Sequence, residues 1–450
     1  METGDLPAWR KGLYILLGAV TMGVMWRTRG EHGWGSSWGV MAAGLVYTLF
    51  VYFIFQRKNN ASFFHIGVAA VSMMLTTPAW GPLLNQICGR IEATVTQDTL
   101  PCTPLSGIFM MLCLGFATPA FFAFFISRLF SEKQYKWYHY LIVIAVPLAV
   151  YYISEATISH LIVGLVQPET KKAVADFING STDLSGTPYS LYMRHFNNIA
   201  WAKKHLAYGR TYFTEIATVS RAIAALAAYI TVRFGLKDKT GGRITVFGCA
   251  AMAVSITVPD LFFLFKEKYP DIAWLSSAWS FWEYFTGFLF GGIFTAVLLA
   301  FSRMADGGIH EKHLAAIPRV PRELFHAAFT FGFCLCLPVF RPIAERFDAS
   351  DKMKILTYII GLGVSLVFAG LMLAGKMKKL WRQNAVKLSR TAFPLYFGIQ
   401  AFIYLFSGDS ECIRNIYERG PVLYLMLISY AAFYALYYSV TFKNKKECFV

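Results

Sequence analysis

The sequence predicts an all-α polytopic membrane protein, and two observations carry that prediction. The chain is 56% hydrophobic and only 15% charged, with a mean hydropathy of +0.47, whereas soluble domains carry about 25% charged residues. Apolar stretches of about 20 residues recur from end to end, and each is long enough to cross a hydrocarbon core of about 30 Å as a helix. A membrane barrel would instead show segments of about ten residues with alternating polarity.

The apolar stretches define about twelve transmembrane helices. They cover residues 12–27, 35–55, 62–82, 104–127, 139–166, 212–232, 244–265, 274–302, 323–340, 354–375, 391–407 and 421–442. The first stretch leads into Arg27 rather than into a small-residue cleavage site, so we interpret it as a retained span and not as a signal peptide.

The distribution of basic residues predicts the topology. The net charge is +16, and Lys and Arg are concentrated in the loops on one side of the spans, which indicates that both termini are cytoplasmic. This pattern is a signal for topology and lipid headgroups, so we expect the lipid bilayer as a partner and no nucleic acid. The chain carries no eukaryotic sorting signal, which favours the plasma membrane of a bacterium, its inner membrane.

Two stretches of the chain resemble each other and suggest an internal repeat. The third span begins with Phe-His and ends in Pro-x-aromatic-x-Pro, and the ninth span has the same pattern; the matching residues are 64–65 with 78–82, and 325–326 with 338–342. Six spans separate the copies, so both run in the same direction. The repeat predicts two parallel six-helix halves, 1–232 and 233–450, as in one class of secondary transporters whose site lies between the halves.

The external segments contain one long piece and two cysteines. Residues 167–211 form the long piece, which we interpret as an interfacial helix or, alternatively, as a lid over the external mouth. Cys88 and Cys102 bracket another predicted external loop and could form a disulfide in an oxidising compartment. The eight cysteines show no metal-ligand spacing, and no phosphate-cradling Gly loop or hydrolase elbow is present, so we expect no metal and no cofactor.

The turn between the first two spans is the most charged part of an otherwise apolar region. Arg27, Arg29, Glu31 and His32 lie between two apolar runs, among glycines and tryptophans typical of a turn at the membrane interface. The second half of the chain has no matching sequence. We therefore predict that these four residues contact the substrate.

Further ionisable residues lie within or at the ends of spans, in the middle or outer half of the membrane. Glu155, Asp260 and Glu283 are candidates for proton or ion coupling, and Arg221 and Arg341 are candidates for substrate binding. Ionisable groups in a bilayer are costly and often functional. The alternative is structural: the acids could pair with Arg27, Arg221 or Arg341.

These patterns leave three functional hypotheses, and whether the protein is an enzyme stays open. The leading one is a secondary transporter or permease for a small polar, anionic solute, reached through an outward-facing polar cavity. The second is a membrane-embedded transferase that moves a glycosyl, acyl or phospho group from a lipid-linked substrate at the external face, with Glu31 and His32 as catalytic residues. The third is a non-catalytic assembly or scaffold protein, in which the outer acids would be paired with one another and would leave no solvent-accessible cavity.

Overall fold

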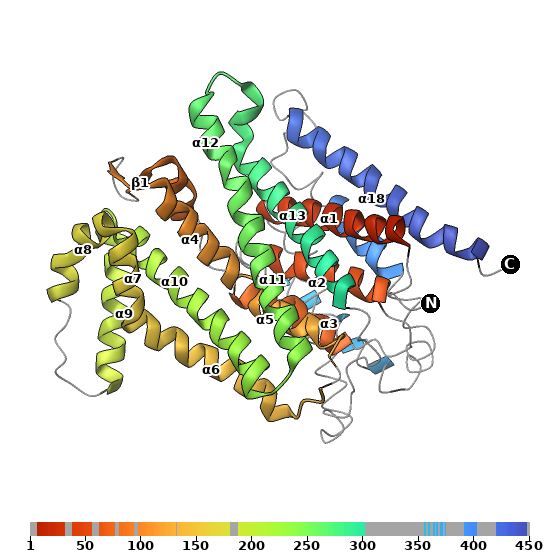
Figure 1. Ribbon diagram of the computed structural model, residues 1–450, viewed down its shortest axis with the longest axis horizontal. Coiled ribbons are helices and arrows are strands. Elements are labelled where there is room, and N and C mark those ends of the chain that lie inside the picture. The colour runs from red at the N-terminus through yellow and green to blue at the C-terminus, as the bar shows by residue number, and fades with distance from the viewer. Residues whose placement is uncertain are drawn as a thin grey trace.

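The described part of the chain is a bundle of helices with one small hairpin of strands, which confirms the all-α class (Figure 1). The computed structural model describes residues 7–31, 38–55, 63–76, 81–93, 98–131, 133–180, 188–301, 391–402 and 420–447, with short pieces between 355 and 374. The ninth predicted span, 323–340, lies outside the described residues, and so does the second copy of the repeat.

Helix α1 (Ala8–Glu31) runs through the inside of the bundle. It packs against α13 (Ala278–Phe301) along its length, and also against α2 (Trp38–Phe55) and α18 (Gly420–Glu447). From Leu17 onwards, most of its side chains are fully buried. The polar side chains of this buried part of α1 therefore face other helices rather than the outer surface.

Small residues allow the close approach of α1 and α13. A Cβ atom added at Gly287 would lie 2.1 Å from the carbonyl oxygen of Met22, and one at Gly291 would lie 2.2 Å from the carbonyl oxygen of Gly18. Real Cβ atoms do not tolerate such distances, so the two backbones touch where the glycines lie. Close backbone contact through small residues is typical of helix pairs in membranes.

Several predicted spans are interrupted rather than continuous. The interrupted spans are α4–α5 (Pro104–Ala117, Ala120–Ser127), α6–α7 (Trp137–Ala156, Ile158–Val166), α10–η3 (Gly209–Ile230, Thr231–Gly235) and α11–η4–α12 (Lys239–Thr257, Val258–Asp260, Leu261–Lys268). Pro119 and Pro259 lie at two of the breaks, where proline removes a backbone donor and clashes with the preceding turn.

Several of the connecting segments contain short helices or strands. After α3 (Phe63–Thr76) comes the 3₁₀ helix η2 (Gly81–Cys88), followed by an antiparallel hairpin of β1 (Arg90–Glu92) and β2 (Thr99–Pro101). The predicted long external piece forms two helices, α8 (Pro168–Gly180) and α9 (Pro188–His205), at the edge of the bundle beside α10. The short helix η5 (Ala273–Ser277) leads into α13.

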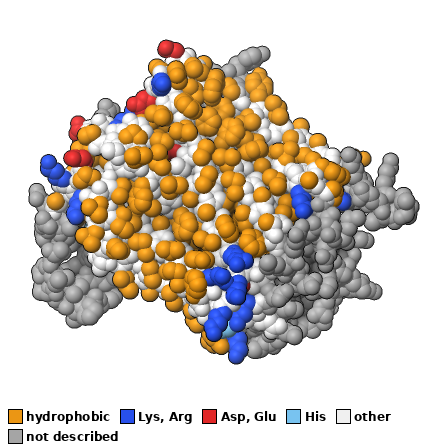
Figure 2. All heavy atoms as spheres, in the orientation of Figure 1, with side chains coloured by type: hydrophobic (Ala, Val, Ile, Leu, Met, Phe, Trp, Pro, Cys, Tyr) orange, Lys and Arg blue, Asp and Glu red, His pale blue; other side chains and the backbone are white. Residues whose placement is uncertain are grey.

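The outer surface of the helices is apolar. Among the described residues, six segments are long and apolar enough to cross a membrane: 104–127, 137–156, 209–235, 239–268, 273–301 and 421–441. Hydrophobic side chains cover most of the face seen in Figure 2, over α4, α10, α11 and α13. These features support a membrane protein, while the number of twelve spans and the side of the termini stay predictions.

Candidate functional site

The structure brings three of the predicted site residues together at the contact of α1 with α13. Arg27 Nη1 donates a 2.7 Å hydrogen bond to Glu283 Oε2, and Arg29 Nη2 lies 3.8 Å from Glu283 Oε1. We call these three residues the α1–α13 ion group. All three are buried, with 6%, 1% and 2% of their surface exposed. The sequence analysis named this pairing of Glu283 with Arg27 as the structural alternative.

Local packing fixes the Arg29 side chain. Its guanidinium carbon lies 4.3 Å from the centre of the Trp26 ring, a cation–π distance. Gly39, at the start of α2, lies against its stem: an added Cβ would be 2.6 Å from Arg29 Cβ. The arginine is therefore held between an aromatic ring of its own helix and a glycine of the next.

Asp260 lies at the break between α11 and α12, directly after Pro259. Its side chain is fully buried, and neither carboxyl oxygen has a hydrogen-bond partner among the described residues. The other buried acids of the described chain, Glu215, Asp238 and Glu283, each accept at least one hydrogen bond. Since buried polar groups are nearly always satisfied, Asp260 is the exception that calls for an explanation.

Two contacts locate Asp260 relative to its surroundings. Trp282, the neighbour of Glu283 in α13, donates from Nε1 to the carbonyl oxygen of Ile256 at 3.1 Å, one turn before Asp260. Helix α13 thus joins the ion group to the segment that carries Asp260. On another side lies Cys88, at the end of η2, which is close enough for the two side chains to interact electrostatically.

The region around Cys88 and Asp260 is bordered by an ion pair at the surface. Arg90 Nη1 of β1 lies 2.5 Å from Glu267 Oε1 of α12, and both side chains are partly exposed. Burial, reinforced by a hydrogen bond to Glu267, raises the pKa of Cys88 to about 12. The Cys88 thiol is therefore protonated at neutral pH.

Glu155 and Arg221 lie on α6 and α10, where they share an aromatic neighbour. The Tyr151 hydroxyl donates to Glu155 Oε1 at 2.9 Å, and the Arg221 guanidinium lies 5.9 Å from the centre of the Tyr151 ring. Lys203 of α9 is close enough to interact electrostatically with both Glu155 and Arg221. The sequence named these residues as one set with Arg27 and Glu283, but the structure places them on a different helix pair.

Sequence reasoning missed a buried network beside the β1–β2 hairpin. Glu215 accepts from Gln86 Nε2 at 2.7 Å and from Thr170 Oγ1 at 2.8 Å, and Gln167 Nε2 donates to Gln86 Oε1 at 2.9 Å. All four side chains are buried. Glutamines at the ends of apolar runs were the available signal, but their partners come from η2, α8 and α10 and only the fold reveals them.

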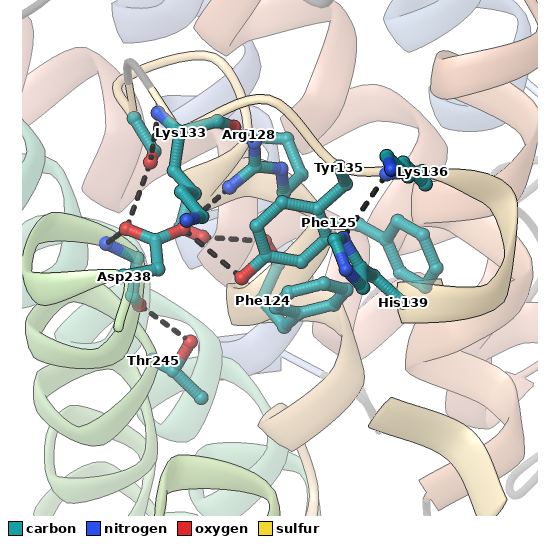
Figure 3. A network of polar contacts seen from close by, with 12 residues as sticks. Phe124, Phe125, Arg128, Lys133, Tyr135, Lys136, His139, Asp238 and Thr245 are labelled. Atoms are coloured by element: carbon teal, nitrogen blue, oxygen red, sulfur yellow. Dashed lines mark hydrogen bonds and ion pairs between the residues drawn. The ribbon is translucent and has the colours of Figure 1, made fainter. Parts of the chain in front are cut away.

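A second missed network lies at the other end of α11 (Figure 3). Asp238 caps this helix by accepting from the Gly241 backbone at 2.7 Å. It also accepts from Arg128 Nη1 at 2.5 Å, Ser131 Oγ at 2.8 Å and the Tyr135 hydroxyl at 3.1 Å. Aspartate is one of the preferred N-cap residues, so this cap could have been predicted from the sequence.

The remaining sequence predictions concern three site residues, a disulfide and a metal site. His32 and Arg341 lie outside the described residues, as does the side chain of Glu31, the last residue of α1. Cys88 and Cys102 are free thiols in the structure, not a disulfide. Among the described residues, no group of three or more His, Cys, Asp or Glu side chains could hold a metal ion.

Comparison with known proteins gives no relative. No family model matches the chain, and neither a curated protein nor a solved structure is similar to it.

Proposed function

We propose that this protein is a membrane transporter for a small anionic solute, with Asp260 as the residue that couples transport to proton movement. The observation that carries the proposal is the fully buried Asp260 carboxyl, which has no hydrogen-bond partner in the described chain and lies at a helix break. The proposal includes the twelve-helix arrangement in two halves and a location in the plasma membrane.

The environment of Asp260 argues against a purely structural role. A carboxylate buried without partners is costly, so a structural acid is expected to be paired, as Asp238 is. A carboxyl that alternately takes up and releases a proton has a reason to lack a permanent partner. Interrupted helices in membranes occur where the backbone lines a protein interior or an aqueous path, and transporters build their sites at such breaks. The lack of a described partner for Asp260 supports transport over the scaffold hypothesis, which expects paired acids.

The α1–α13 ion group supports an anionic solute. Two guanidinium groups and one carboxylate are buried together, and guanidinium groups bind carboxylates and phosphates through charge-assisted hydrogen bonds. In this proposal, Glu283 holds Arg27 and Arg29 in position, and a solute anion replaces Glu283 as their partner. The exchange keeps the arginines paired at each step, which avoids exposing an isolated charge to a medium of low dielectric constant.

The test is uptake into proteoliposomes that contain the purified protein and a pH-sensitive dye. A panel of small carboxylates and phosphate esters, chosen by metabolite profiling of cells with and without the protein, supplies the solutes. With the wild-type protein, we expect solute entry to change the pH of the proteoliposome lumen. Asp260→Asn is expected to abolish net proton-coupled uptake but to retain exchange of solute for solute, because the neutral amide can no longer release a proton.

Asp271→Asn is the matched control, since Asp271 is exposed in the turn after α12 and should leave uptake unchanged. Unchanged net uptake in Asp260→Asn would contradict the assignment of Asp260. Unchanged uptake in a variant with both Asp260 and Glu283 neutralised would contradict the transport proposal as a whole.

The transferase hypothesis stays a prediction from the sequence, because the side chains of Glu31 and His32 lie outside the described residues. Envelope-glycan profiling on the same cells tests it directly. Loss of a glycan modification in Glu31→Gln, at normal protein levels and with no change in any solute, would favour transfer over transport.

A further inference from the structure

A group of basic side chains lies at the end of the bundle where α5, α6, η3 and α11 begin or end. We call it the basic cluster, and it consists of Lys133, Lys136, Arg233, Lys237, Lys239 and Arg243. Figure 2 shows Lys and Arg side chains gathered in this area, at the lower border of the hydrophobic surface. Five of the six side chains are exposed, and Arg233 is half-buried.

The nearby acid does not neutralise this cluster. In the two stretches that supply it, 128–139 and 233–243, the sequence has only Glu132 and Asp238 as acids. Asp238 is buried, and its two oxygens already accept from Arg128, Ser131, Tyr135 and the Gly241 backbone (Figure 3). None of the six basic side chains forms an ion pair with a described acid. The cluster therefore presents a net positive charge to its surroundings.

The fold holds these side chains at neighbouring positions. A Cβ atom added at Gly242 would lie 2.7 Å from Arg233 Cβ, so the glycine lets the Arg233 stem pack against the first turn of α11. Lys237 adopts a positive φ of 56° in the tight turn before that helix. From the facing side, Lys133, Lys136 and Arg128 all lie close enough to the His139 ring to act on it electrostatically.

The cluster adjoins a surface suited to lipid tails. Trp137 and Leu141 of α6 are 67% and 54% exposed, and α6 as a whole is one of the apolar segments able to cross a membrane. Tyr138 is also exposed, with Lys136 Nζ 5.8 Å from the centre of its ring. Aromatic side chains next to basic ones, at the end of an apolar helix, are typical of the headgroup level of a bilayer.

We propose that the basic cluster is a binding site for the headgroup of an anionic phospholipid, whose acyl chains lie along α6. The apolar surface beside the charges selects a lipid over a soluble anion or a nucleic acid, because only a lipid satisfies both parts of the surface. Basic side chains at the ends of transmembrane helices bind anionic headgroups in this way. The proposal is independent of the solute and of the transport mechanism.

The experiment measures lipid binding to the purified protein by native mass spectrometry. Phosphatidylglycerol and phosphatidylcholine with identical acyl chains are offered in equal amounts. We expect the wild type to retain phosphatidylglycerol preferentially, and this preference to fall when the salt concentration during equilibration is raised. The variant K133Q/K136Q/K237Q/K239Q is expected to lose the preference by about tenfold or more.

The matched control is K172Q/K204Q/K266Q/K268Q, which removes the same charge from α8, α9 and α12. It should bind phosphatidylglycerol like the wild type. Equal retention of both lipids by the wild type would overturn the proposal without any variant. An equal loss in the control would show a general charge effect, and displacement of the lipid by millimolar inorganic phosphate would show a soluble-anion site; either result would overturn it.

Discussion

A buried aspartate lies near each end of α11: Asp238 caps its first turn, and Asp260 ends the short helix η4 that follows it, and the two have opposite surroundings. Asp238 accepts hydrogen bonds from Arg128, Ser131, Tyr135 and the backbone of its own helix. Asp260 is as deeply buried but has no hydrogen-bond partner among the described residues. Two buried residues of the same type, at opposite ends of α11, thus differ: Asp238 has four hydrogen-bond donors, and Asp260 has none among the described residues.

The difference separates a structural carboxylate from a functional one. At Asp238, the positive charge of Arg128 and three further donors compensate the cost of burying the carboxylate. The network therefore stabilises the contact between the end of α5 and the start of α11. At Asp260 no described group compensates an ionised carboxyl, so its charge state can respond to protons. Four predictions test this comparison, from the largest expected effect on stability to the smallest.

Asp238→Ala should lower the free energy of unfolding by about 3–5 kcal/mol, because it leaves the buried Arg128 without its counter-charge. The measurement is an SDS titration in mixed micelles. In the double variant with Arg128→Ala, the loss should be smaller than the sum of the two single losses. Additive losses would mean that the ion pair does not fasten the two helices.

Glu283→Gln should lower the free energy of unfolding by about 2–3 kcal/mol, because Arg27 and Arg29 lose a buried carboxylate but keep a neutral acceptor. The same titration measures it, with the exposed Asp271→Asn as the control. A loss as small as that of the control would show that the ion group does not hold α1 and α13 together.

Tyr135→Phe should cost about 1 kcal/mol, since it removes one of the four donors to Asp238. The phenyl ring should still lie under the Arg128 guanidinium, whose carbon is 3.8 Å from the ring centre. Retention of the aromatic contact is checked with Tyr135→Ala, which is expected to cost clearly more. Equal losses in the two variants would assign the whole effect to the hydroxyl.

Asp260→Asn should change the free energy of unfolding by less than about 1 kcal/mol, because no described hydrogen bond is lost. The same variant is expected to lose proton-coupled uptake, so Asp260 should affect transport without a large effect on stability, whereas Asp238 should affect stability. A loss of stability comparable to that of Asp238→Ala would reveal a structural role for Asp260 and would contradict the proposed difference between the two aspartates.

Much of the fold could be predicted from the sequence. Helices α1, α2, α10, α13 and α18 lie close to the predicted spans at 12–27, 35–55, 212–232, 274–302 and 421–442. Helix breaks such as the one at 258–260 were not predicted, although Pro259 was visible. Hydropathy averages over a window of residues, so it detects the length of an apolar segment but not a local interruption within it.

The candidate site was predicted residue by residue but not as an arrangement. Arg27, Arg29, Asp260 and Glu283 were each named because charge is rare in apolar segments. The sequence named Arg27 as one of three possible partners for the acids but could not decide that it pairs with Glu283, 256 residues away, or that Asp260 has no described partner. Likewise, the sequence marked His65 as part of the Phe-His pattern at the start of the third span, but only the structure shows that it is buried, with Tyr52 and the Phe125 carbonyl oxygen each 2.7 Å from a ring nitrogen.

The sequence by itself determined that this protein is helical and suited to a membrane. A bilayer offers no hydrogen bonds, so long apolar segments must satisfy their own backbone groups, and the helix is the local solution. The tertiary structure alone decided which charges are paired. Hydrophobic burial has no direction and specifies no partner, whereas an ion pair needs two side chains within a few ångströms. Only the packing of α1 on α13, and of α5 on α11, decides that Glu283 and Asp238 have partners while Asp260 has none among the described residues.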